Sequence, residues 1–145
     1  MSYTKIWIHG VWATKNRQKF LNKDVRVSLF EHIKENAIKK DIFLDSINGY
    51  NDHIHVLLCL KREQNIADCI QLIKGESSFW INKNKLTSQK FEWQDDYFAV
   101  SVSNSKITVL RSYIKNQEEH HKSISYSDEY DEFMKNYGFD QNRNG

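Results

Sequence analysis

Four segments of the chain have the hydrophobic pattern of β-strands. Residues 3–14 alternate between polar and apolar positions and are rich in aromatic and β-branched side chains, which favours a strand. Residues 42–50 and 53–60 predict two more strands joined by a short turn at Asn51-Asp52. Residues 97–102 (YFAVSV) predict a fourth strand.

Between and after these strands, apolar residues recur at helical spacing. Residues 24–40 predict a helix with Asp24 as its N-cap and lysines at its C-terminal end. A second helix is expected to start after Asn65 and run to about residue 83, with Gly75 as a weak point inside it. A third, capped by Asn104 or Ser105, is expected over residues 106–121, and a short amphipathic helix over residues 127–137.

The predicted order is β-α-β-β-α-β followed by helices. This order is typical of the α+β ferredoxin-like or RRM-like plan, an antiparallel sheet covered on one face by two helices. The chain has no proline and five glycines, so no composition break marks a linker. We therefore expect a single domain over residues 1–145, with a C-terminal helix in the tail from about residue 123 and frayed residues at the end.

Composition narrows the class of protein. Hydrophobic residues make up 39% of the 145 residues, which is enough for a core and excludes a disordered protein. Because no apolar run is long enough to span a membrane and the N-terminus lacks a signal-peptide pattern, we expect a cytoplasmic protein. Cys59 and Cys69 are too few for a disulfide framework or a zinc site and are interpreted as core residues. The net charge is only +2, but residues 1–94 are basic and the remainder acidic, which is compatible with a nucleic-acid partner.

The first candidate site is His53-Ile54-His55, at the start of the third strand. Alternation places both imidazoles on one face of the sheet and Ile54 on the other, with the core. On the open face the two histidines could chelate one divalent ion. A pair of solvent-exposed histidines is the alternative.

The second candidate is Tyr113 with Gln117, one turn apart on the third helix. A tyrosine hydroxyl can act as a covalent nucleophile, and a glutamine oxygen could complete a metal site that two histidines leave open. Taken alone, this spacing favours a packed tyrosine ring and an exposed glutamine. His120-His121 are interpreted as a pair favoured by the helix dipole rather than as ligands.

Six further residues are candidates for DNA contacts. Lys15, Arg17, Lys74 and Ser77 could meet phosphates, and Trp12 and Trp93 could stack on unpaired bases. The alternatives are a solvated helix face for Lys74 and Ser77, and core packing for the tryptophans.

In their joint order these features resemble the HUH-type single-tyrosine transposases of small bacterial insertion sequences, the IS200-like family with its REP-associated relatives. The resemblance covers essentially the whole chain. It is carried by residues 11–17 (VWATKNR), 52–57 (DHIHVL), 74–78 (KGESS), 93–97 (WQDDY), 101–103 (SVS) and 113–121 (YIKNQEEHH).

The resemblance implies a site and a reaction. His53, His55 and Gln117 would bind Mg²⁺ or Mn²⁺, and Tyr113 would attack a phosphate of single-stranded DNA to give a 5′-phosphotyrosine link and a free 3′-OH. Strands would then rejoin without ATP, so no nucleotide cofactor is implied. Members of the family recognise DNA hairpins and act as homodimers in bacteria or archaea, associated with the nucleoid when active. The alternatives are a catalytically silent module that binds nucleic-acid hairpins on the same fold, and a structural or metal-storage protein.

Overall fold

The computed structural model describes residues 1–137, and its four strands form one antiparallel sheet. The strand order is β2-β3-β1-β4, so the first strand lies at the centre between the third and the fourth. The sheet and the α+β fold are as predicted from the sequence. The strands are β1 (Ile6–Ala13), β2 (Phe43–Gly49), β3 (His53–Leu60) and β4 (Phe98–Val102).

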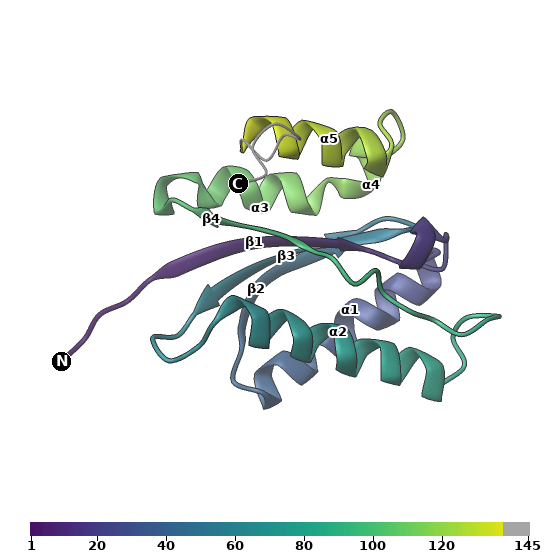
Figure 1. The fold of residues 1–145 in the computed structure, drawn as a ribbon, viewed down its shortest axis with the longest axis horizontal. Coiled ribbons are helices and arrows are strands. Elements are labelled where there is room, and N and C mark those ends of the chain that lie inside the picture. Colours follow the sequence, from purple (N-terminus) through teal and green to yellow (C-terminus); the bar gives the residue numbers. More distant parts are fainter. Residues whose placement is uncertain (138–145) are drawn as a thin grey trace.

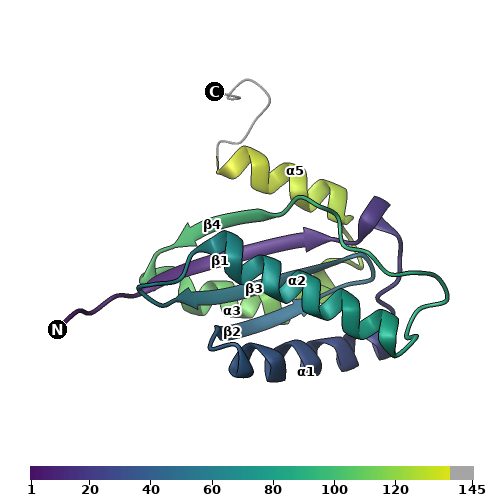
Figure 2. The ribbon, with the colours of Figure 1, turned by 60° about the horizontal axis from the view of Figure 1, so that its bottom comes forward.

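Helices cover both faces of this sheet, not one. Figure 1 shows α1 and α2 on one face and α3, α4 and α5 on the other, and Figure 2 shows α1 and α2 lying across the strands. The open face expected for the histidine pair is therefore covered by the C-terminal helices. The helices are α1 (Lys23–Lys39), α2 (Ile66–Lys83), α3 (Ile107–Lys115), α4 (Gln117–His120) and α5 (Tyr126–Asn136), with 3₁₀ turns at Lys15–Arg17 and Asn104–Lys106.

The core has two layers because both faces of β3 are buried. Ile54, Val56 and Leu58 pack beneath α1 and α2, as the alternation predicts. Leu57 lies on the opposite face, in a cluster that includes Ile114 of α3. Burial on both faces explains why the sequence of β3 is an almost continuous apolar run and does not alternate between polar and apolar residues.

The predicted N-cap of the first helix is wrong, whereas the predicted start of the second is correct. Asn22, not Asp24, caps α1 by accepting a hydrogen bond from the Val25 backbone N–H at 3.0 Å. The second helix, α2, starts after Asn65 as predicted, and Asn65 caps it by accepting a hydrogen bond from the Asp68 N–H. Asp24 instead lies in the first turn of α1, where its negative charge interacts favourably with the helix dipole.

The third predicted helix is divided in two. A 3₁₀ turn precedes α3, so neither Asn104 nor Ser105 caps it, and α3 ends at Lys115, with Asn116 between it and α4. Asn48 of β2 explains the position of the break, because its side-chain amide donates to the carbonyls of Ile114 and Lys115 at 2.9 and 3.0 Å. A partner 66 residues away in the chain thus ends the helix.

The last helix, α5, starts at Tyr126, one position before the predicted start, and Ser125 caps it by accepting a hydrogen bond from the Asp128 N–H. Residues 141–145, expected to fray, lie outside the described residues. Cys59 and Cys69 are both free, and Cys69 is buried in the core. No helix within residues 1–137 is long and apolar enough to cross a membrane.

The turn between β2 and β3 requires a glycine. A Cβ at Gly49 would lie 2.2 Å from the carbonyl oxygen of His53 and 2.9 Å from the Cα of Ile54. Any side chain would push β2 away from the start of β3, where His53 and His55 lie. Gly49 therefore contributes directly to the geometry of the candidate site.

Gly75 has no such role, and this leads to a prediction. It lies exposed inside α2, and a Cβ there meets nothing within 4 Å. Because alanine loses less conformational entropy in a helix, Gly75→Ala should raise the free energy of unfolding by about 0.5–1 kcal/mol. Urea denaturation followed by circular dichroism measures this, and a lower midpoint in the variant would contradict it.

Candidate active site

His53 and His55 lie on the face of the sheet that α3, α4 and α5 cover, and both are fully buried. Each has one ring nitrogen engaged by a neighbour: His53 Nδ1 lies 2.8 Å from Asp52 Oδ1, and His55 Nδ1 lies 2.9 Å from His9 Nε2. Their Nε2 atoms are thereby aimed away from these partners and toward the helices. The exposed-pair alternative is excluded, and so is a position on an open face.

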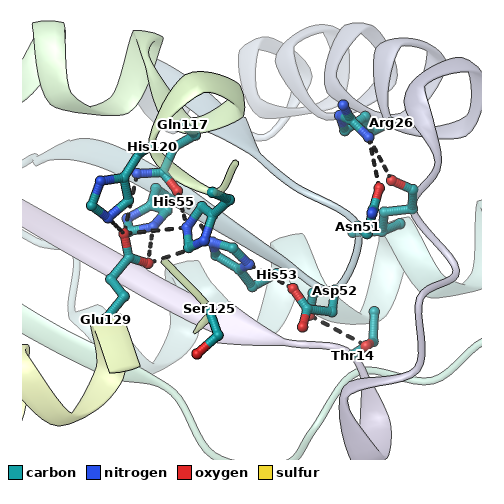
Figure 3. A network of polar contacts seen from close by, with 12 residues as sticks. Thr14, Arg26, Asn51, Asp52, His53, His55, Gln117, His120, Ser125 and Glu129 are labelled. Carbon is teal, nitrogen blue, oxygen red and sulfur yellow. Dashed lines mark hydrogen bonds and ion pairs between the residues drawn. The ribbon is translucent and has the colours of Figure 1, made fainter. Parts of the chain in front are cut away.

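The two Nε2 atoms face a group of oxygen atoms (Figure 3). Gln117 Oε1 lies 3.1 Å from His53 Nε2. Glu129 Oε1 lies 3.0 Å from His55 Nε2 and 3.5 Å from His53 Nε2. The histidine pair of β3, the amide of α4 and a carboxylate of α5 therefore converge in one buried cluster.

Two further residues belong to this cluster: His121, for which the sequence pattern wrongly favoured a helix-dipole role over a ligand role, and Glu129, which the sequence did not single out. One ligand atom from each of His53, His55, His121 and Glu129 lies within 4.8 Å of the others. His121 Nε2 also lies 2.9 Å from Gln117 Oε1, so it does more than end a helix. Local patterning gave no signal for Glu129, which is one of several acids in an amphipathic tail.

The geometry and chemistry of the cluster fit a divalent cation. Ligands bonded to Mg²⁺ at about 2.0–2.1 Å lie about 3 Å apart when adjacent in an octahedron, close to the 3.0–3.5 Å separations described above. Imidazole nitrogens held at Nδ1 by a neighbour are typical of metal-binding histidines. The buried His/Glu group could thus hold a metal ion.

Tyr113 lies beside this group, half-buried at the end of α3. Its hydroxyl donates a hydrogen bond to Glu129 Oε2, and His120 Nε2 lies 3.4 Å away. Its ring packs edge-on against His55, with centroids 5.6 Å apart. Burial and the carboxylate of Glu129 raise the pKa of Tyr113 above its usual value, so the phenol is protonated at neutral pH.

Burial keeps the imidazoles of His9 and His55 neutral at pH 7. Burial lowers the pKa of His55 to about 4, against the opposing pull of Glu129, and burial with neighbouring His55 lowers that of His9 to about 3. Burial alone would raise the pKa of Glu129, but hydrogen bonds from His121 and His55 outweigh it and hold that pKa well below its usual range. Neutral imidazole and ionised carboxylate are the forms that bind metal.

His9 supports His55 and offers a test of the cluster. The two rings are stacked, with centroids 5.2 Å apart, and His9 is buried on β1. Replacing it with phenylalanine keeps a ring there but removes the hydrogen-bond partner of His55 Nδ1. Loss of such an outer partner typically costs 10–100-fold in metal affinity, so His9→Phe should weaken Mn²⁺ binding by about that factor. Isothermal titration calorimetry on the folded variant checks this, and unchanged affinity would exclude the supporting role.

The three basic candidates for DNA contacts have different surroundings. Arg17 is exposed, and its guanidinium lies 5.4 Å from the ring centre of Tyr126. Lys15 is exposed and forms an ion pair with Glu92 at 3.1 Å. Lys74 donates to the backbone carbonyls of Gln94 and Asp95, so it holds the loop before β4. Arg17 is the best placed of the three to meet a ligand.

The other three candidates lie in the core. Trp12 and Trp93 are 1% and 7% exposed and pack edge-to-face, with centroids 6.1 Å apart. Ser77 is fully buried, where it accepts a hydrogen bond from the Trp93 indole at 3.0 Å. These side chains pack between α2 and the sheet and expose little surface, although Trp12 borders the cavity that Arg17 also lines.

Comparisons with known proteins identify the family of the chain. A model of the family described as "Transposase IS200 like" matches residues 2–117. The chain is 25% identical to the ISDra2 transposase TnpA of Deinococcus radiodurans over 115 residues, which cover 75% of this chain and 81% of that protein.

Two solved structures are similar. A putative transposase from Deinococcus radiodurans R1 aligns with a TM-score of 0.65 at 25% identity, covering 80% of this chain and 93% of that one. A REP-associated tyrosine transposase bound to a REP hairpin aligns with a TM-score of 0.64 at 14% identity, covering 86% of this chain and 73% of that one, and shows a shared fold. Since the family match spans most of the sequence, the chain belongs to the IS200-like transposase family.

Proposed function

We propose that this transposase cleaves and rejoins single-stranded DNA through a covalent link to Tyr113. The observation that carries the proposal is the convergence of a tyrosine hydroxyl and a buried His/Gln/Glu group in one site. His53, His55 and Gln117 are the proposed protein ligands of Mg²⁺ or Mn²⁺. When bound, the cation supplies charge stabilisation for a phosphate, which is otherwise a poor electrophile.

In the proposed reaction, Tyr113 Oη forms a bond to phosphorus and the bond from phosphorus to the 3′ oxygen breaks. The phenol loses its proton and the departing oxygen gains one, leaving a 5′-phosphotyrosine and a free 3′-OH. Attack by another 3′-OH on the phosphotyrosine restores the phosphodiester and releases the phenol. Because the bond energy is kept in the covalent link, joining requires no nucleotide cofactor.

A cavity beside the histidines could receive the DNA strand. Its volume is about 500 Å³, and its lining includes Asn16, Arg17, Tyr97 and Tyr126. Tyr126 also stacks on His53, with ring centroids 4.4 Å apart, so the ring of Tyr126 separates the cavity from the proposed metal site. Aromatic rings and a guanidinium are suited to unpaired bases and phosphates. We propose a hairpin-containing single strand as the substrate, a class consistent with the hairpin bound by the REP-associated relative.

We further propose that the protein acts as a homodimer in the cytoplasm. Within residues 1–137 of one chain, Tyr113 already lies beside His55, so the single chain is compatible with a site completed in cis. A partner's tyrosine helix could replace α3 in the same position. Mixing Tyr113→Phe with His53→Ala chains and assaying adduct formation distinguishes the two arrangements.

Covalent trapping tests the proposed function. The protein is incubated with single-stranded hairpin oligonucleotides, including the DNA that flanks its own gene, with and without Mn²⁺. A denaturing gel and peptide mass spectrometry then locate any adduct. We expect an Mn²⁺-dependent adduct on Tyr113. Hairpin binding without an adduct, on the flanking DNA, would identify a silent binding module instead.

A further inference from the structure

Helix α5 lies beyond the residues that the family model matches, yet it supplies the carboxylate at the centre of the site. Glu129 is 1% exposed, and its two oxygens have different neighbours. Oε1 faces His55 Nε2 at 3.0 Å and His53 Nε2 at 3.5 Å. Oε2 accepts the hydrogen bond of the Tyr113 hydroxyl. One carboxylate thus connects the two histidines of β3 with the tyrosine.

No permanently charged cation among residues 1–137 pairs with Glu129. Within residues 1–137, its ion-pair partners are imidazoles, and no lysine or arginine nitrogen lies within 4 Å of its carboxylate. Burying an ionised carboxylate without a permanent positive partner costs free energy of folding, because the carboxylate loses its hydration. A divalent cation between Glu129 and the two Nε2 atoms would supply a permanent positive charge at a position where three ligand atoms already face one another.

We propose that Glu129 is a carboxylate ligand of the catalytic metal through Oε1 and anchors the Tyr113 hydroxyl through Oε2, so that α5 fixes the nucleophile relative to the cation. This inference rests on the proposed function, since it assumes that Tyr113 and the histidine pair act together. It adds an anionic oxygen to a set of two imidazoles and one amide, which makes the site better suited to Mg²⁺ or Mn²⁺.

The test is Mn²⁺ binding by the full chain, measured by calorimetry and by electron paramagnetic resonance of free Mn²⁺. Glu129→Gln keeps the shape and an acceptor oxygen but removes the negative charge, and it should weaken Mn²⁺ binding by about tenfold or more. Asp131→Asn, an exposed site on the same helix, removes the same charge and should leave the affinity unchanged. Equal affinity of Glu129→Gln and the wild type would overturn the proposal.

A second readout separates anchoring of the tyrosine from metal affinity. At saturating Mn²⁺, Glu129→Ala should form the Tyr113 adduct about tenfold more slowly or worse, because a displaced nucleophile reacts poorly. An unchanged rate would remove the anchoring role. Circular dichroism verifies folding of each variant. If Glu129→Gln fails to fold, Glu129→Asp is used instead, because it keeps the charge on a shorter side chain. This variant should bind Mn²⁺ more weakly than the wild type, and equal affinity would overturn the proposal.

Failure of this inference is distinguishable from failure of the proposed function. If Glu129 is not a ligand, Glu129→Gln binds Mn²⁺ normally while His53→Ala does not. If the proposed function is wrong, the wild type itself forms no Mn²⁺-dependent adduct with any hairpin strand that it binds.

Discussion

Tyr113→Phe is expected to abolish the covalent DNA adduct while leaving the fold and hairpin binding intact. The change removes one oxygen atom, the one that Glu129 and His120 contact. The phenylalanine ring can keep the edge-on packing against His55, so the cost in stability should be small. The measurement is adduct formation on a denaturing gel beside an electrophoretic mobility shift with the same hairpin.

The matched control is Tyr3→Phe, because Tyr3 is exposed near the N-terminus, which extends away from the domain in Figure 2. This variant should form the adduct at the wild-type rate. Tyr126 is the nearest competing phenol, since its ring stacks on His53. An adduct that persists in Tyr113→Phe and maps to Tyr126 would show that the nucleophile has been assigned to the wrong tyrosine.

The sheet and the helices beneath it were predictable because their signals are local. The structure gives β3 the predicted bounds, His53–Leu60, since an apolar run between turn residues defines a strand without reference to the rest of the chain. The same applies to α2, whose cap at Asn65 is a short-range hydrogen bond. Alternation also placed His53 and His55 on the same face and Ile54 on the other, as observed.

What the sequence did not reveal depends on long-range contacts. The break after α3 requires Asn48 of β2, and the burial of the histidines requires α3, α4 and α5 to dock on the second face. Periodicity describes which side of a helix is apolar but not which surface it will cover. For the same reason Glu129 could not be separated from its acidic neighbours, since only its place in the folded chain brings it to the histidines.

Trp12 and Trp93 were predicted to contact DNA because their rings could stack on bases, but in the structure these rings pack in the core. An aromatic ring can stack on a base or fill a core, and the residue type alone does not decide between them. Here their mutual contact and that with Ser77 place them between α2 and the sheet. Of the predicted DNA contacts, Arg17 keeps an exposed position beside the cavity and remains a prediction.

His53→Ala should lower Mn²⁺ affinity by more than about 100-fold and abolish the adduct. This exceeds the roughly 10–100-fold loss of metal affinity that follows when a hydrogen-bond partner of a ligand is removed. His53 Nε2 is the atom that both Gln117 Oε1 and Glu129 Oε1 face, so its loss opens the centre of the cluster and leaves both oxygens without their shared neighbour.

His32→Ala is the matched control, because His32 is a partly buried histidine that pairs with Glu76 and stacks on Trp80, on the opposite side of the sheet. It should bind Mn²⁺ as the wild type does. Hairpin affinity in His53→Ala, measured without metal, should be close to that of the wild type, because the phosphate contacts along the strand do not depend on the buried imidazole. If His53→Ala binds Mn²⁺ normally and still forms the adduct, the histidine pair is excluded from the reaction. If the variant loses both hairpin binding and the fold, His53 has a structural role instead.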